Sequence, residues 1–328
     1  MAWKCALNKY IDNQELFEEL ISITAEKLGL AEISVVEKDF YVTQAIDILT
    51  KIENPHFKLI FQGGTCLAKA HHLIQRMSED CDFRIISKTQ HTYGNDKQRQ
   101  LLRELRKQIV DALQHHGFII DQPSLKIHNE GQFIEISAKY PTIFPIAQAL
   151  KPHLALEFFL EKLRTSPEAK MVTTMIRHAL DEKINHPEFT VEVMSVVENA
   201  AEKWVALTRR VSATQYNNSN YDHNLIRHLY DLYIINRHDL LTKDFPKLVI
   251  DIIKHDSEKF KSQNPQYYKN PAKEIKLALQ MLQHDQKWQT YWDEFMQTMV
   301  FGSHQLNYQT ALKQIIELSN KVLSKLTI

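Results

Sequence analysis

The chain has 328 residues, of which 44% are hydrophobic, and this length favours two lobes over a single hydrophobic core. Forty basic residues balance forty acidic ones, so the net charge of zero excludes a protein that is drawn as a whole onto nucleic acid or an anionic membrane. Seven glycines and ten prolines are too few for an all-β fold rich in turns and favour a largely helical chain.

Cysteine usage and hydropathy indicate the compartment. Cys5, Cys66 and Cys81 are odd in number and form no C-x-x-C pair, which is typical of a reduced environment. The N-terminus lacks an apolar signal region, and no apolar stretch approaches the roughly 20 residues that a membrane helix needs. We therefore expect a cytoplasmic protein that does not associate with a membrane.

The first part of the chain alternates between helical and strand patterns. Apolar residues recur at three- and four-residue steps in the predicted helices, whereas short apolar or alternating runs mark the predicted strands. Helices are predicted over residues 13–29, 36–51, 65–74 and 96–118, and strands over 56–61, 81–87, 124–128, 132–140, 153–160 and 188–196.

Nearly every segment after the last predicted strand has helical spacing. We therefore expect an α+β fold, in which residues 1–195 form a lobe with a mixed sheet and flanking helices. Residues 196–328 are expected to form a second, helical lobe. The predicted helices of this lobe span 197–213, 222–237, 243–261, 271–285, 288–299 and 306–326.

Two short motifs lie close together between residues 61 and 84. Asp80 and Asp82 are separated by one residue in a predicted strand, so their side chains point to one face about 6.5 to 7 Å apart. Two carboxylates so placed can share Mg²⁺, whose remaining ligands are waters and substrate phosphates. Gly63 and Gly64 mark a strand-to-helix turn where backbone N–H groups can approach a phosphate, and the helix beginning near Thr65 adds its positive dipole end.

Each of these motifs has a plain alternative when it is taken singly. A D-x-D pair is often a solvated strand end, and a glycine pair is often a simple turn. The succession of strand, G-G-T, helix and D-x-D strand places a phosphate turn beside a metal pair. It therefore favours a site for a metal-bound nucleoside triphosphate.

This succession resembles the DNA polymerase β-like nucleotidyltransferase superfamily and, more closely, its AbiEii/AbiGii toxin family. The first motif of that family has Gly-Ser, a Leu, and an Arg ahead of D-x-D, matched here by Gly63-Gly64, Leu67, Arg76 and Asp80-Cys81-Asp82. Gly64 replaces the Ser. Residues 35–46, which read VVEKDFYVTQAI, also resemble the E-K-D-aromatic stretch of the family.

The second motif of the family is an acidic residue in an apolar strand, which Glu157 matches in the run LALEFF. The resemblance implies that Glu157 completes the metal ligands or accepts a proton from the attacking hydroxyl. A charge in an apolar strand is costly unless it is paired or ligating, although simple alternation toward solvent remains an alternative. Glu135 in the run FIEIS has the same surroundings and is the competing candidate.

The third motif, Lys-x-x-Ala-x-x-x-Arg, is matched by Lys203, Ala206 and Arg210. On a helix these positions share one face, so Lys203 and Arg210 can reach the same anion. The resemblance implies that Lys203 binds a nucleotide phosphate and stabilises charge on the transferring group. A solvated basic helix end is the alternative.

The fourth motif, Arg-x-Lys-Asp-x-x-Asp-Leu, is only half retained in residues 225–232. Asp231 and Leu232 match, and the resemblance makes Asp231 an active-site acid. Leu225, Arg227 and His228 stand where the Arg, Lys and first Asp would be, and His228 is a candidate hydrogen-bonding substitute.

The resemblance implies a Mg²⁺-dependent nucleotidyltransferase that acts as the toxin of a type IV toxin–antitoxin or abortive-infection phage-defence system. Residues 1–195 are then expected to be the catalytic lobe, and the helical lobe of residues 196–328 is expected to complete the nucleotide-binding cleft. Its expected partners are an NTP, a cognate antitoxin encoded nearby, and tRNA or another RNA, with the tRNA 3′ end as the acceptor. Two other hypotheses remain open: a nucleotide-binding regulator without turnover, which the divergent fourth motif favours, and a transferase or kinase acting on protein hydroxyls.

The candidate residues fall into three overlapping sets, and a separate basic helix is either a solvated face or an RNA-binding surface. The proposed metal ligands are Asp80, Asp82 and Glu157. The proposed catalytic residues are these three with Lys203 and Asp231, the nucleotide-binding residues are Gly63, Gly64, Thr65, Arg76, Lys203 and Arg210, and the basic helix carries Lys97, Arg99, Arg103, Arg106 and Lys107.

Overall fold

The computed structural model describes residues 13–89, 93–148, 150–180, 188–216, 222–300 and 306–326. These residues form two compact units. Unit 1 comprises the described residues up to 71 together with those between 78 and 194, and unit 2 comprises 72–77 and those from 195 onward. No helix among the described residues is long and apolar enough to cross a membrane.

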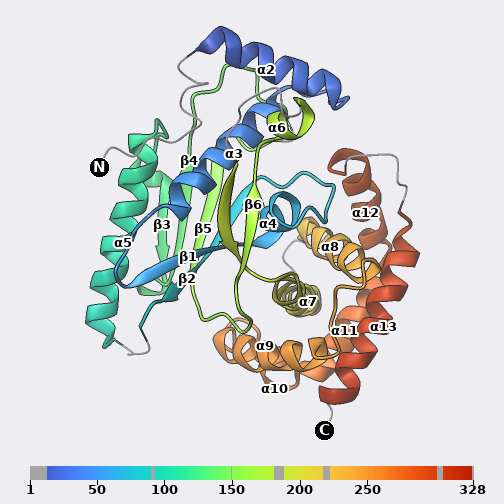
Figure 1. Ribbon diagram of the computed structural model, residues 1–328. Coiled ribbons are helices and arrows are strands. Elements are labelled where there is room, and N and C mark those ends of the chain that lie inside the picture. The colour runs from blue at the N-terminus through green and yellow to red at the C-terminus, as the bar shows by residue number, and fades with distance from the viewer. Residues whose placement is uncertain are drawn as a thin grey trace. The chain divides into compact units, whose positions relative to one another are not determined.

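Unit 1 is built on a seven-stranded mixed sheet with the strand order β3-β4-β5-β2-β1-β7-β6 (Figure 1). Strand β2 lies near the middle, antiparallel to β1 and parallel to β5. The expected mixed sheet with flanking helices is therefore confirmed. The strands are β1 (Phe57–Gln62), β2 (Asp80–Ser87), β3 (Leu125–His128), β4 (Phe133–Ala138), β5 (Leu154–Leu160), β6 (Glu168–Val172) and β7 (Phe189–Val193).

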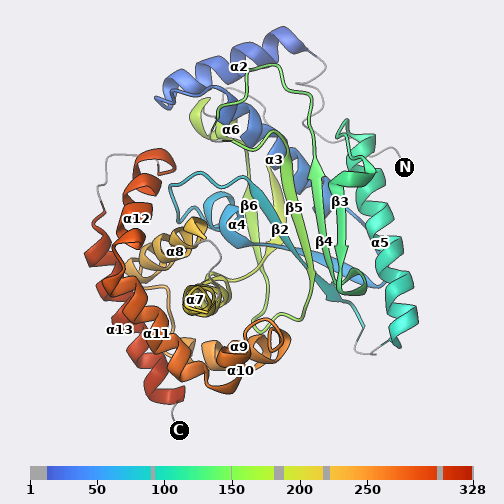
Figure 2. The ribbon, with the colours of Figure 1, turned by 180° about the vertical axis from the view of Figure 1, so that it is seen from behind.

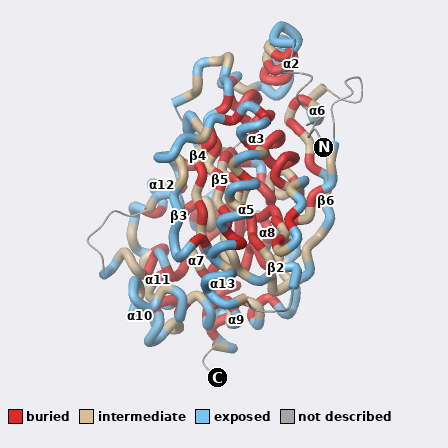
Figure 3. Tube along the Cα trace, turned by 90° about the vertical axis from the view of Figure 1, so that its left-hand side faces the viewer, coloured by how far each residue is buried: buried red, intermediate tan, exposed pale blue. Residues whose placement is uncertain are grey.

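The hydrophobic core of unit 1 covers one face of this sheet. Phe83 lies between Phe61 and Phe158, with ring centroids 5.4 and 5.6 Å away. Helix α3 is buried over most of its length (Figure 3). Because strand side chains alternate, residues one position away from the phenylalanines point to the opposite face. The helices of unit 1 are α2 (Gln14–Lys27), α3 (Ser34–Thr50), α4 (Gly63–Lys69), α5 (Asn95–His115) and α6 (Met175–Leu180).

Helix α4 is shorter than its hydrophobic spacing predicts. It ends at Lys69 rather than continuing to residue 74, and the chain then leaves unit 1 at residue 72. Within unit 2, the Met77 amide donates to the carbonyl oxygen of Met299 at 2.7 Å. The helical pattern predicted over residues 70–74 is therefore overridden where the chain enters unit 2.

The described residues of unit 2 are helical apart from connections and an isolated bridge between Arg76 and Val300, as expected for the C-terminal part. Helix α7 is surrounded by α8, α9, α11 and α13 (Figures 1 and 2). Trp204 of α7 is fully buried, and its indole N–H donates to the Ser319 hydroxyl of α13 at 3.0 Å. The helices are α7 (Val196–Ala213), α8 (Ile226–Arg237), α9 (Phe245–Lys259), α10 (Pro265–Lys269), α11 (Pro271–His284), α12 (Gln286–Thr298) and α13 (Tyr308–Leu326).

Candidate active site

A row of acidic residues crosses the sheet face opposite the phenylalanine core. Asp82 of β2 is paired with Glu157 of β5, and Glu157 is paired in turn with Glu135 of β4. Directly paired residues share a face, and neighbouring strands lie about 4.8 Å apart. Asp80 lies two residues before Asp82 and so shares this face. The structure therefore places the three predicted metal ligands on one sheet face, along two adjacent strands.

Glu157 and Glu135 differ in their neighbours. Glu157 is in the strand adjacent to Asp82, whereas Glu135 is one strand farther away. The Glu135 carboxylate also has two basic partners, with the Lys126 Nζ at 3.2 Å and the His128 Nε2 at 3.6 Å. Strand order thus distinguishes two glutamates whose sequence surroundings are alike.

Gly63 brings the glycine motif into contact with the D-x-D motif. It begins α4 with a φ of +81°, a conformation that favours glycine. A Cβ atom added to Gly63 would lie 2.0 Å from Oδ2 of Asp82. The missing side chain therefore leaves the space that the Asp82 carboxylate occupies, and no other residue fits this position without displacing it.

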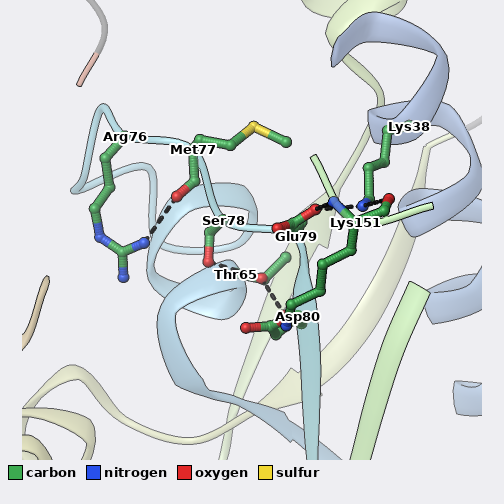
Figure 4. Close-up of polar contacts among 8 residues, drawn as sticks. All are labelled: Lys38, Thr65, Arg76, Met77, Ser78, Glu79, Asp80 and Lys151. Carbon is green, nitrogen blue, oxygen red and sulfur yellow. Dashed lines mark hydrogen bonds and ion pairs between the residues drawn. The ribbon is translucent and has the colours of Figure 1, made fainter. Parts of the chain in front are cut away.

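Thr65 ties α4 to the start of β2. Its side chain is buried, and its hydroxyl donates to the carbonyl oxygen of Asp80 (Figure 4). The same hydroxyl is hydrogen-bonded to that of Ser78 at 3.0 Å. The Thr65 hydroxyl is thus used for hydrogen bonds within the protein. The backbone N–H of Thr65 is the group through which this residue can bind a phosphate.

Asp80 is paired with a lysine that sequence reasoning missed. The Lys151 Nζ lies 2.7 Å from Oδ1 of Asp80, and both side chains are partly exposed, by 45% and 34%. Among the described residues, no three or more His, Cys, Asp or Glu side chains are arranged so that they could hold a metal ion. The Asp80 carboxylate thus faces an ammonium group at the place where the sequence predicts a cation.

Two acidic residues of the E-K-D-aromatic stretch, on α3, hold neighbouring segments of unit 1 in place. The Glu37 carboxylate accepts from the Thr142 hydroxyl and the Ile143 amide, both at 2.7 Å, and burial raises its pKa in spite of these bonds. Asp39 accepts from Lys69, the last residue of α4, at 2.5 Å and from the Met175 amide at 2.7 Å. Glu37 and Asp39 therefore anchor a loop and two helix ends instead of lining a ligand site.

Unit 2 contains a buried cluster of three motif residues. The Arg76 guanidinium binds Asp231 through two parallel bonds of 2.7 and 2.8 Å, and the Lys203 Nζ lies 2.9 Å from the same carboxylate. Burial by itself would raise the pKa of Asp231, but Arg76 and Lys203 outweigh burial and hold that pKa well below its usual range. Asp231 is therefore ionised, and it fixes both cations.

Arg210, the second cation of the third motif, lies outside this cluster. It is exposed and pairs with Asp222, so it does not share the carboxylate partner of Lys203.

His228, the candidate substitute in the fourth motif, is buried. Its Nδ1 atom has no hydrogen-bond partner among the described residues. Burial and the nearby Lys203 charge lower the pKa of His228 well below its usual value, which keeps the imidazole neutral near pH 7.

The basic helix α5 covers the sheet face that is opposite to the acidic row. Its apolar residues, such as Leu105 and Ile109, join the same core as Phe83 and Phe158. Arg99 on its exposed side pairs with Glu130. An acceptor bound along α5 would therefore contact the far side of the sheet from Asp82.

The chain is similar to one protein family and to solved structures. A family profile described as "Nucleotidyl transferase AbiEii toxin, Type IV TA system" matches residues 48–314, which is well over half of the chain. Among solved structures, a nucleotidyltransferase toxin of Mycobacterium tuberculosis named MenT4 matches with 17% identity and a TM-score of 0.37. That match covers 69% of this chain and 76% of the other. No curated protein gives a significant match.

Proposed function

Since the chain belongs to the AbiEii family of nucleotidyltransferase toxins from type IV toxin–antitoxin systems, we propose that it transfers a nucleotide from an NTP to the 3′ end of tRNA in a Mg²⁺-dependent reaction. Family membership makes the chain a nucleotidyltransferase with a nucleotide substrate and an antitoxin partner. The metal, the RNA acceptor and a role in phage defence in the cytoplasm are the parts that we propose.

The contact between Gly63 and Asp82 is the observation that carries this proposal. The turn at Gly63, which we assign to phosphate binding, lies against the Asp82 carboxylate, and Asp82 is paired with Glu157 in the next strand. Asp80, Asp82 and Glu157 supply hard oxygen ligands on one sheet face, which is the donor set that Mg²⁺ prefers. Bound by these residues, the ion would neutralise charge on the triphosphate and on the transferring group.

Glu157 is preferred over Glu135 as the third acidic residue. It stands one strand from Asp82, whereas Glu135 stands two strands away and is paired with Lys126. In the proposed reaction, the acceptor hydroxyl oxygen forms a bond to the α-phosphorus and the bond to pyrophosphate breaks. Glu157 either completes the metal ligands or accepts the proton that the hydroxyl loses.

Each unit carries its own candidate groups for binding phosphate. The backbone N–H groups of Gly63, Gly64 and Thr65 supply neutral donors, which suits a turn that a side chain would fill. Lys203 and Arg210 are assigned to phosphate charge because they form the third motif of the family. In this assignment Arg76 and Asp231 orient Lys203, because the buried carboxylate binds both cations.

The proposal is tested by incubating the purified protein with Mg²⁺, total tRNA and each NTP carrying label on either the α- or the γ-phosphate. Wild type is expected to transfer the α-label to tRNA. The variant carrying Asp80→Ala and Asp82→Ala is expected to lose this transfer by about 1,000-fold or more, because both carboxylates that hold the cation are gone. Lys126→Ala, on the same sheet face, serves as the folded control.

Each other outcome points to a defined alternative. Transfer of the γ-label to protein would favour a kinase that acts on protein hydroxyls. NTP binding without any labelled product would favour a regulator without turnover. Equal incorporation by wild type and the double variant would exclude these carboxylates from the chemistry.

A further inference from the structure

The backbone of Lys151 is held on both sides by a buried ion pair. The Lys38 Nζ donates to the Lys151 carbonyl oxygen at 2.6 Å, and the Lys151 amide donates to Oε2 of Glu79 at 3.0 Å. Lys38 and Glu79 also bind each other (Figure 4). Lys151 is thus attached through its main chain to α3 and to the residue that precedes Asp80.

The burial of this pair makes the attachment rigid. The Lys38 side chain is fully buried and that of Glu79 is 4% exposed. Two charges removed from water are tolerated only where they are well paired and further hydrogen-bonded. The Lys151 amide and carbonyl oxygen supply those further bonds, so a displacement of Lys151 would leave buried charges unsatisfied.

The side chain of Lys151 is held far less tightly than its backbone. Its Nζ contacts Asp80 at 2.7 Å, yet 45% of the side chain is exposed to solvent. Exposed ion pairs contribute little free energy and exchange readily with competing ions. The ammonium group therefore sits beside Asp80 at a fixed place and can leave without disturbing the backbone that carries it.

The position of this ammonium group also has an electrostatic consequence. Asp80 and Asp82 point to the same face of β2 and repel each other when no cation lies between them. The positive charge of Lys151 offsets that repulsion at Asp80. It holds the Asp80 carboxylate in a defined position in the metal-free protein.

We propose that Lys151 is a positioning residue of the metal site: its ammonium group takes the place of a divalent cation beside Asp80 and is displaced when the cation binds. This inference rests on the proposed function, in which Asp80 and Asp82 bind the cation. It adds that the cation competes with a lysine of the protein itself, which the buried pair of Lys38 and Glu79 holds in place.

Binding of Mn²⁺ to the metal-free protein tests this inference directly, with free Mn²⁺ measured by electron paramagnetic resonance. Lys151→Met is expected to bind Mn²⁺ about two- to fivefold more tightly than wild type, the range set by the loss of an exposed ion pair. Lys151→Arg keeps the charge and is expected to stay near the wild-type affinity. Lys126→Met is the matched control, because it removes an exposed lysine paired with a carboxylate on the same sheet face.

The outcomes separate this inference from the proposed function. If Asp80→Asn with Asp82→Asn binds Mn²⁺ as wild type does, the proposed metal site itself is wrong. If that variant loses binding but Lys151→Met binds as wild type or more weakly, only the role of Lys151 is wrong. Tighter binding by Lys126→Met than by Lys151→Met would also overturn it and would move the site toward Glu135.

Discussion

Each unit of the molecule holds a motif aspartate with a lysine, but the two aspartates are held in different ways. Asp80 in unit 1 is 34% exposed and pairs with Lys151. Asp231 in unit 2 has no exposed side-chain surface and binds both Arg76 and Lys203. The first pair can open to admit a ligand, whereas the second fixes its cations in place. Burial and the number of partners thus separate a candidate metal ligand, Asp80, from a carboxylate that orients two cations, Asp231.

Breaking the buried centre in unit 2 is expected to have the largest effect. Arg76→Met removes two bonds from Asp231 and leaves its buried charge to Lys203 alone. We expect the free energy of unfolding to fall by about 3 to 5 kcal/mol, measured by urea denaturation. Adding Asp231→Leu is expected to restore part of this loss, and a loss below about 1 kcal/mol for Arg76→Met would contradict the contrast between the units.

Gly63→Ala probes the contact between the two motifs of unit 1. The added Cβ would lie 2.0 Å from the Asp82 carboxylate and displace it, so we expect nucleotide transfer to fall about 100-fold or more. Gly117→Ala is the matched control, because Gly117 also has a positive φ, of +89°, but no atom within 4 Å of an added Cβ. Equal loss of transfer in both variants would point to backbone strain instead of the Asp82 contact.

The buried centre also predicts a dependence of stability on acid. The folded pKa of Asp231 is held below its unfolded value of about 3.9, so its contribution to stability is complete above that pH and is lost as the pH falls toward the folded pKa. The difference in free energy of unfolding between wild type and Asp231→Asn should therefore shrink below about pH 4, by up to about 1.4 kcal/mol per pH unit. Urea denaturation at pH 6, 5, 4 and 3 measures it, and a constant difference would refute the prediction.

The smallest effect is expected at an exposed ion pair. Arg210→Ala removes the exposed pair with Asp222 and should change the free energy of unfolding by less than about 1 kcal/mol. Arg209→Ala, one residue earlier, should cost more, because Arg209 is largely buried, binds Asp256 at 2.7 Å and lies 3.9 Å from the Phe260 ring centroid. Thermal unfolding of both variants checks this order, and a larger loss for Arg210→Ala would reverse it.

Periodicity predicted most of the fold because most elements have a clear apolar face. The expected α+β class is confirmed, and strands such as β2 and β5 lie where alternation placed them. Three short elements, β6, α6 and α10, were missed. Strand β6 lies at the sheet edge and reads EAKMV, and this segment is too short and too weakly apolar for its alternation to mark a strand.

Local patterns could not predict contacts between distant segments. Residues 70–74 continue the helical pattern of α4 but are not helical, and the bond from Arg76 to Asp231 joins positions 155 residues apart. Lys151 belongs to no motif, and its contact with Asp80 exists only in the folded protein. Glu157 and Glu135 have equivalent surroundings in the sequence, and only the strand order distinguishes them.

The most direct test of the acidic row compares two conservative variants in the α-label assay with total tRNA. Glu157→Gln is expected to lower nucleotide transfer by about 100-fold or more, because a ligand or proton acceptor next to Asp82 is lost. Glu135→Gln, one strand farther along the same row, is expected to stay within about threefold of wild type. Equal rates for the two variants, or a larger loss for Glu135→Gln, would contradict the proposed site.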